Sequence, residues 1–252
     1  MLSSKVILVT GACGLLGQQI VQEIIEQNGC VLATDTDTEK AKKLFQTLPS
    51  EQITFSPMDI TDADSIDQAI SDGLKQFRSV DACVNSAYPR TARWGTPFEK
   101  LEIEDIQENL KLQLGGAIVL SQRLMKHFVA QGQGNLIHLS SIMGVVSPKF
   151  ENYAGTSMTS PIEYTAVKSG IISMTSWLAK YYKNKSIRVN CVSPGGILDQ
   201  QPEPFLKKYR ESCTSKGMLD STDVAGTVMF LLSEQSKYIN GQNIVVDDGW
   251  SL

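Results

Sequence analysis

The chain has 252 residues, of which 42% are hydrophobic and 20% are charged. This length is common for a single α/β domain, and it is enough to bury a full hydrophobic core. The formal net charge is -4 and the sequence has no basic run, which argues against a nucleic-acid partner.

The beginning of the chain, its apolar runs and its cysteines exclude further classes. Residues 1–4 lead straight into the first predicted strand and lack the layout of a signal peptide. No apolar run approaches the ~18 residues that a membrane-spanning helix needs. The five cysteines are scattered, and no Cys-x-x-Cys pair occurs. We therefore expect a cytoplasmic protein with no membrane contact and no structural metal.

The first part of the chain predicts a strand, a glycine-rich turn and a helix. Residues 6–9 are an unbroken apolar run, as in a strand buried on both faces. Gly11, Gly14 and Gly17 follow, and after them apolar residues recur once per helical turn. Such a turn aims backbone N–H groups and the positive end of the helix at one point, which suits a pyrophosphate.

A carboxylate follows the second predicted strand. The apolar run 30–34 ends at Asp35, 18 residues after Gly17. An acid there can accept both ribose hydroxyls of an adenosine, and it repels a 2′-phosphate. Asp35 therefore favours NAD(H) over NADP(H). Two alternatives are that Asp35 is only a turn residue, or that Asp37 takes this role.

Strand and helix patterns alternate along the rest of the chain. This alternation predicts a doubly wound parallel sheet covered by helices on both faces, in one domain over residues 1–252. The further predicted helices are 38–48, 61–77, 101–129, 163–182, 204–209 and 222–232. The further predicted strands are 53–55, 80–84, 135–139, 187–192 and 243–246. Residues 88–97 and 143–161 are predicted to be irregular.

The candidate functional residues follow the predicted strands. Ligands of open α/β sheets bind outside the carboxyl ends of the strands. The candidates at such ends are residues 11–17, Asp35, Asp59, Asn85, Ser141 and residues 194–196. Their common placement predicts one nucleotide site at this edge of the sheet.

Tyr164, Lys168 and Ser141 carry the predicted chemistry. The first two are four residues apart in a helical pattern, so their side chains share one face. A free tyrosine has a pKa of about 10, and a nearby lysine cation favours its phenolate. Ser141 follows the neighbouring strand and can hydrogen-bond a carbonyl oxygen. These are the groups that proton-coupled hydride transfer needs, although a surface hydrogen-bond pair is an alternative for Tyr164 and Lys168.

Together these motifs resemble the short-chain dehydrogenase/reductase family over nearly the whole chain. The resemblance rests on Thr10-Gly11-x-x-Gly14-x-x-Gly17, Asp59, Asn85-x-Ala87, Ser141, Tyr164-x-x-x-Lys168, Pro194-Gly195 and Gly241-Gln242-x-Ile244-x-Val246-Asp247. It implies a seven-stranded Rossmann-like sheet and a homotetramer or homodimer. It also implies that Tyr164 is the acid/base, that Ser141 contacts the substrate oxygen and that Lys168 bonds the nicotinamide ribose.

The resemblance also implies which residues contact NAD. These are Gly11, Cys13, Gly14, Leu15, Leu16, Gly17, Asp35, Asp59, Ile60, Asn85, Ser86, Ala87, Tyr164, Lys168, Pro194, Gly195 and Ile197. Cys13 lies near a helix N-terminus, but we expect an inert small residue rather than a reactive thiolate. His138 lies in the middle of a predicted strand, where we expect a packed, hydrogen-bonded side chain.

The chain departs from the family pattern in four places. The glycines are spaced three apart, as in the longer sugar-nucleotide members. Tyr88 stands where a glycine usually follows the Asn-x-Ala motif, which predicts a narrower nicotinamide side. The fourth catalytic residue is an asparagine in the family, and its place falls on Gln113, with Asn109 one turn earlier. Ser141 and Tyr164 are 23 residues apart, more than is usual, which predicts an inserted loop over the site.

The inserted loop and the ending Val246-Asp247-Asp248-Gly249-Trp250 resemble a narrower group. They are similar to short-chain reductases of bacterial flagellin-modification and surface-sugar (nonulosonate) pathways. This implies a phosphorylated or nucleotide-linked sugar as substrate. Arg90, Arg93 and Lys149 are then candidates to lie near a phosphate or carboxylate, and solvated loop charges are the alternative.

Three functions are compatible with these observations. The leading hypothesis is an NAD(H)-dependent oxidoreductase that interconverts an alcohol and a ketone on a polar, sugar-derived substrate. The second is a 3-oxoacyl thioester reductase of fatty-acid type, against which Asp35 counts because such enzymes usually use NADPH. The third is a dinucleotide-binding regulator without turnover, which would need none of Ser141, Tyr164 and Lys168.

Overall fold

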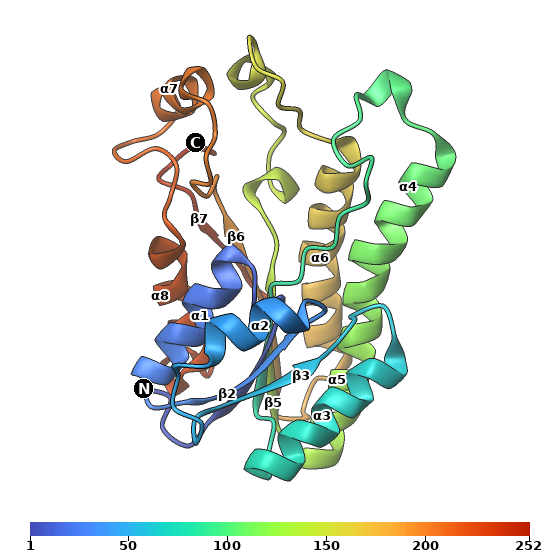
Figure 1. Cartoon of the computed structure of the whole chain (residues 1–252), viewed down its shortest axis with the longest axis vertical. Helices are drawn as coiled ribbons and strands as arrows, with labels where there is room; N and C mark the ends of the chain where they lie inside the picture. Colours follow the sequence, from blue (N-terminus) through green and yellow to red (C-terminus); the bar gives the residue numbers. More distant parts are fainter.

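Seven parallel strands form one sheet in the order β3-β2-β1-β4-β5-β6-β7 in the computed structural model, which describes residues 1–252 (Figure 1). The strands are β1 (Val6–Thr10), β2 (Cys30–Asp35), β3 (Ile53–Pro57), β4 (Ala82–Asn85), β5 (Gly134–Leu139), β6 (Ile187–Pro194) and β7 (Asn243–Val246). The strand order reverses between β1 and β4. In a doubly wound sheet this reversal opens a crevice at the carboxyl ends of the strands.

Helices cover both faces of this sheet. They are α1 (Leu15–Glu26), α2 (Thr38–Phe45), α3 (Ala63–Phe77), α4 (Ile103–Leu110), α5 (Gly116–Gln131), α6 (Ile162–Tyr181), α7 (Glu203–Glu211) and α8 (Ser221–Leu232). Apolar residues of α1 and α8 share one core, and apolar residues of α3 and α5 share the other. None of the helices combines the length and the apolar character needed to cross a lipid bilayer.

The unbroken apolar runs of the strands follow from this layering. Along β1, Ile7 and Val9 belong to the core under α1 and α8, whereas Leu8 belongs to the core under α3 and α5. The same alternation recurs in β2, where Val31 and Leu32 lie in different cores. Successive side chains of a strand point to opposite faces, so a sheet with two buried faces needs apolar residues at every position.

The predicted helix 101–129 is interrupted, which corrects the sequence analysis. A π-helical turn over Lys111–Gly115 separates α4 from α5. Two adjacent glycines, Gly115 and Gly116, make a wider turn easy to form. Gly116 also packs so closely on Ile60 that an added Cβ would lie 2.9 Å from its side chain. The interruption therefore brings this helix against the end of β3.

The inserted segment 143–161 contains two short 3₁₀ turns, Ile142–Gly144 and Phe150–Tyr153. The Lys149 ammonium donates to the backbone oxygen of Trp250 at 2.9 Å. From α7, Lys208 donates to the backbone oxygens of Glu151 and Ala154 at 3.1 and 2.9 Å. These contacts attach the segment to the C-terminal part of the chain.

Candidate active site

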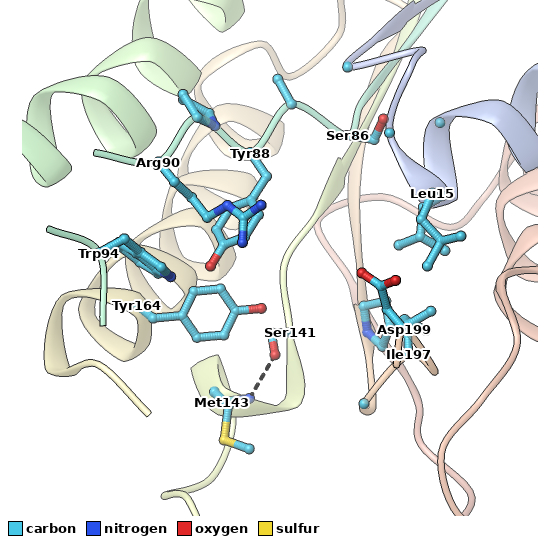
Figure 2. Close-up of a pocket in the computed structure, with 18 of the residues that line it drawn as sticks. Leu15, Ser86, Tyr88, Arg90, Trp94, Ser141, Met143, Tyr164, Ile197 and Asp199 are labelled. Carbon is cyan, nitrogen blue, oxygen red and sulfur yellow. Dashed lines mark hydrogen bonds between the residues drawn. The ribbon is translucent and has the colours of Figure 1, made fainter. Parts of the chain in front are cut away.

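A cavity of about 780 Å³ lies at the carboxyl edge of the sheet. One end, the glycine-turn end, is lined by Gly11, residues 13–17, Asp35, Lys40 and Asp59. The other, the aromatic end, is lined by the rings of Tyr88, Trp94, Tyr153, Tyr164, Phe205 and Tyr209. Figure 2 shows Leu15 and Ser86 on one side of this space and Tyr88, Trp94 and Tyr164 on the other.

Glycine is required at the glycine-turn end by close backbone contacts. Gly11 has a φ of +61°, and an added Cβ would lie 2.8 Å from the Cα of Ala87. A Cβ on Gly17 would lie 2.1 Å from the backbone oxygen of Gly11. Gly14 caps α1 without a side-chain hydrogen bond to the first turn. The N–H groups of that turn are therefore available to an anion, as the sequence predicts for a pyrophosphate.

Asp35 and Asp37 have different partners at this end. Asp35 accepts from the backbone N–H of Cys13 at 2.9 Å and from that of Asp37 at 3.1 Å, and it lines the cavity. Asp37 instead caps α2 by accepting from the N–H of Lys40 at 2.9 Å. Each oxygen of Asp35 keeps a lone pair for a ribose hydroxyl. Burial, followed by the charge of Asp35, raises the pKa of the Cys13 thiol to about 12, as expected of an inert cysteine.

Asn85 lies beneath the cavity and does not line it. Its side-chain oxygen accepts from Thr10 Oγ1 at 2.8 Å, and its nitrogen lies 3.2 Å from Nδ1 of His138. The other ring nitrogen of His138 lies 3.3 Å from Ser121 Oγ. Because burial lowers the pKa of His138 to about 3, the ring is neutral and accepts from Asn85 at Nδ1. Asn85 thus ties β1, β4 and β5 together, and His138 is packed and hydrogen-bonded as predicted.

Tyr164 and Ser141 face each other across the aromatic end (Figure 2). The first turn of α6 carries Tyr164, and the end of β5 carries Ser141, whose oxygen accepts from the N–H of Met143 at 3.2 Å. Burial raises the pKa of Tyr164, and the facing Ser141 hydroxyl opposes this shift. The charge of Lys168 is not among the causes of this shift, so the expected lowering of the Tyr164 pKa by Lys168 is not found.

Lys168 is covered by the ring of Tyr88. Its ammonium donates to the backbone oxygen of Leu139 at 3.0 Å and lies 5.4 Å from the centre of the Tyr88 ring. Lys168 does not line the cavity. Burial lowers its pKa to about 8, so the ammonium form still predominates at neutral pH. Tyr88 therefore narrows the cavity beside Lys168, where the sequence analysis expects the nicotinamide ribose.

Gln113 also lies outside the cavity, in the π-helical turn. Both polar atoms of its amide are buried without a hydrogen-bond partner. One turn earlier, Asn109 donates to Glu163 at 3.3 Å, and each of these two residues has one further unpartnered oxygen. Unpaired buried polar atoms cost about 1–3 kcal/mol each, and buried water commonly pairs them. Gln113 rather than Asn109 lies in the turn where the helix is interrupted.

Only one of the three candidate cations lines the cavity. Arg93 pairs with Glu102 and Asp105 at 3.2 and 3.3 Å, outside the cavity. Lys149 is held by the backbone oxygen of Trp250 and is also outside. The expectation that these two lie near a substrate anion is therefore wrong. Arg90 does line the cavity, beside Tyr88 (Figure 2).

Most of the predicted contact residues line the cavity, and only Asn85, Lys168 and Gln113 do not. Several lining residues were missed because no motif marks them. They are Thr36, Lys40, Met58, Met143, Met158, Asp199, Gln201, Phe205, Tyr209 and Met218. Those of the inserted segment could have been found from the expected insertion over the site. Those of α7 and its surroundings carry no sequence signal, because the path of the chain after β6 decides which side chains reach the cavity.

The chain is similar to known proteins over nearly its whole length. A family model described as enoyl-(acyl carrier protein) reductase matches residues 11–251. Post-translational flagellin modification protein A of Campylobacter coli is 44% identical over the full length of both chains. The 7alpha-hydroxysteroid dehydrogenase of Bacteroides fragilis is 30% identical, with 99% of this chain and 95% of that protein covered. A short-chain dehydrogenase structure from Leptospira borgpetersenii with bound NAD+ has a TM-score of 0.87 at 29% identity, covering 100% of this chain and 94% of that one.

Proposed function

Because the chain belongs to the short-chain dehydrogenase/reductase family of oxidoreductases, we propose that it interconverts an alcohol and a ketone on a polar, sugar-derived substrate with NAD(H). The observation that carries this proposal is the pair of facing hydroxyls on Tyr164 and Ser141, in the cavity onto which the glycine turn opens. The relative whose name refers to flagellin modification supports a sugar-derived substrate.

The residues of the glycine-turn end fit NAD. The uncapped first turn of α1 offers N–H groups to a pyrophosphate, and Asp35 offers carboxylate oxygens to a ribose. Three carboxylates, those of Asp35, Asp37 and Asp59, line this end against the single cation of Lys40. A 2′-phosphate would meet this negative charge, so we assign NAD(H) rather than NADP(H). The Leptospira borgpetersenii structure, with its NAD+, supports this choice.

The roles of the side chains follow from their chemistry. The nicotinamide supplies or accepts the hydride when it is bound. Tyr164 gives a proton to the substrate oxygen during reduction and takes it back during oxidation, while Ser141 donates a hydrogen bond to that oxygen. Lys168 keeps its ammonium near the phenol and bonds the nicotinamide ribose. Gln113 holds a water for proton exchange with the solvent, in place of the asparagine of the family.

We further propose that the protein acts in the cytoplasm as a homotetramer or homodimer. Large apolar side chains on α5 and α6 support an interface between copies. Ile118, Trp177 and Tyr181 are 51%, 59% and 66% exposed, and the last two rings stack on each other at 4.7 Å. Apolar groups of this size gathered on neighbouring helices are typical of surfaces that pair.

The proposal is tested first by cofactor binding and then by turnover. NADH and NADPH are titrated separately while energy transfer from tryptophan to the nicotinamide is recorded. Phosphorylated and nucleotide-linked sugars are then screened for a change in the absorbance of the reduced nicotinamide. We expect tighter binding of NADH and turnover of a sugar. Tighter binding of NADPH would remove Asp35 from the ribose, and tight NADH binding without turnover of any substrate would favour a regulator.

One observation favours a second candidate function, reduction of a 3-oxoacyl thioester. Met143, Met158 and Met218 line the cavity near the aromatic rings, and such a lining suits an acyl chain. The family model that matches the chain also has an acyl carrier protein in its description. This candidate predicts turnover of acetoacetyl thioesters, and the acidic lining around Asp35 counts against the NADPH that such enzymes usually use.

A further inference from the structure

Two cations at the aromatic end contact the same ring. The guanidinium of Arg90 lies 5.5 Å from the centre of the Tyr88 ring, and the Lys168 ammonium lies 5.4 Å from it. None of the ion pairs of the chain involves either cation. Two positive charges without a carboxylate partner therefore lie close to the predicted acid/base Tyr164. The chain as a whole has a net charge of -4, so the wall around Tyr88 is a positively charged region of a negatively charged protein.

Arg93 provides a comparison within the same loop. It is bound by two carboxylates, from Glu102 and Asp105. Arg90 is three residues away, is exposed and has no such partner. A free cation on the wall of a cavity attracts an anion, because the low-dielectric walls concentrate its field. Asp35, Asp37 and Asp59 also line the cavity, and their carboxylates repel an anion where Arg90 attracts one.

Three aromatic rings lie together beside Arg90. Tyr88, Trp94 and Tyr164 pack edge to face, with centres 5.6, 5.6 and 6.0 Å apart. The hydroxyl of Thr159 donates to the backbone oxygen of Gly95 at 2.8 Å and thereby joins this loop to the inserted segment. Aromatic faces of this kind pack against the C–H faces of a ring-shaped substrate. Figure 2 shows the Arg90 side chain extending along Tyr88 on the same side as Trp94 and Tyr164.

We infer that Arg90 determines substrate specificity by binding an anionic group, a phosphate or a carboxylate, on a ring-shaped substrate that packs against Tyr88 and Trp94. This inference rests on the proposed function, because it assigns the substrate of the same site. A guanidinium offers parallel N–H donors that match either anion in a two-pronged contact. The anion is thereby held beside Tyr88 and Tyr164, at the aromatic end of the cavity.

The experiment measures binding by calorimetry with NADH saturating. The probes are glucose 6-phosphate, glucuronate and glucose, which share a ring and differ in charge. We expect the native protein to bind at least one anionic probe roughly 10- to 100-fold more tightly than glucose, as a charged hydrogen bond allows. The preferred anionic probe identifies phosphate or carboxylate as the group. Arg90→Gln removes the preference, and Arg90→Lys keeps part of it, because a lysine offers charge without the two-pronged geometry.

Arg93→Gln is the matched control, since it removes the same charge three residues away. We expect this variant to keep the preference for the anionic probe, and Arg90→Gln to keep the affinity for NADH. Equal loss in both variants would overturn the inference, as would a native protein that binds neither anionic probe more tightly than glucose. The readout is binding, so a protein that prefers the anion but turns over no sugar would contradict the proposed function alone. Turnover of an anionic sugar that Arg90→Gln leaves unchanged would contradict this inference alone.

Discussion

The two ends of the cavity differ in how far apart their residues lie in the sequence. The glycine-turn end is formed by β1, the start of α1, the ends of β2 and β3 and the first turn of α2, all within the first 60 residues. There the backbone provides the contacts, and the glycines make them possible. The aromatic end combines residues of the 88–97 loop, the inserted segment, α6 and α7. There side chains from distant parts of the chain provide the contacts, and so substrate choice can change while cofactor binding stays the same.

The largest effect is expected from Tyr164→Phe, which should impair the reaction at the aromatic end and leave cofactor binding at the glycine-turn end nearly unchanged. Tyr164→Phe removes the hydroxyl that exchanges a proton with the substrate, so turnover should fall on the order of 10³-fold. NADH binding should stay within a few-fold of the native value, because the turn and Asp35 are untouched. Steady-state rates and the energy-transfer titration measure the two effects. If Tyr164→Phe keeps native turnover, the assigned role of the phenol is wrong.

A smaller effect is expected from the glycine-turn end. Gly17→Ala places a Cβ 2.1 Å from the backbone oxygen of Gly11, so the turn must move. We expect the free energy of unfolding to fall by about 1–3 kcal/mol and NADH to bind more weakly. Urea denaturation and the NADH titration measure these changes.

The control for Gly17→Ala is Gly226→Ala, in α8, where an added Cβ meets nothing within 4 Å. The free energy of unfolding of this variant should rise by about 0.5–1 kcal/mol, because alanine favours a helix more than glycine does. Unchanged NADH affinity in Gly17→Ala, beside this control, would show that the turn does not bind the dinucleotide.

The third effect concerns the buried histidine beneath both ends. His138 has a pKa of about 3 in the folded chain, against about 6.5 for an unfolded histidine. Between these values the unfolded chain binds more protons, so stability falls as the pH drops below about 6.5. Over this range His138 lowers the free energy of unfolding by about 1.4 kcal/mol for each pH unit of acidification. Between pH ~6.5 and pH ~5, the free energy of unfolding of His138→Gln should therefore fall by about 2 kcal/mol less than that of the native chain. Urea denaturation at the two pH values measures this difference. An identical loss in both proteins would contradict the buried neutral ring.

Much of the fold could be predicted because the strands have two buried faces. Ile7 and Leu8 enter different cores, so residues 6–9 of β1 are all apolar and the strand stands out in the sequence. The break between α4 and α5 was not predicted. At this break Gly116 packs against Ile60, which is more than fifty residues away in the sequence. Hydrophobic periodicity describes one helix at a time and does not register such a contact.

In the candidate site, too, features set by local sequence could be predicted and features set by distant contacts could not. Gly17 is predicted by its spacing, because the backbone contact it permits, with Gly11, is local. Gly11 itself contacts Ala87, and that contact depends on the pairing of β1 with β4. Arg90 and Arg93 are the same residue type in the same loop, and only the position of Glu102 and Asp105 decides which one is neutralised. The cover that Tyr88 forms over Lys168 likewise needs the path of the loop as well as the departure from the family motif.

The attachment of the inserted segment to Trp250 has a consequence for the order in which the protein is made. Trp250 is fully buried, stacks on Tyr209 at 5.5 Å and has the Lys149 ammonium 4.7 Å from its ring. A ribosome makes the glycine turn before Trp250. The wall that these three side chains support cannot close until Trp250 has left the exit tunnel. The residues of the glycine-turn end are thus synthesised well before the aromatic end can be completed.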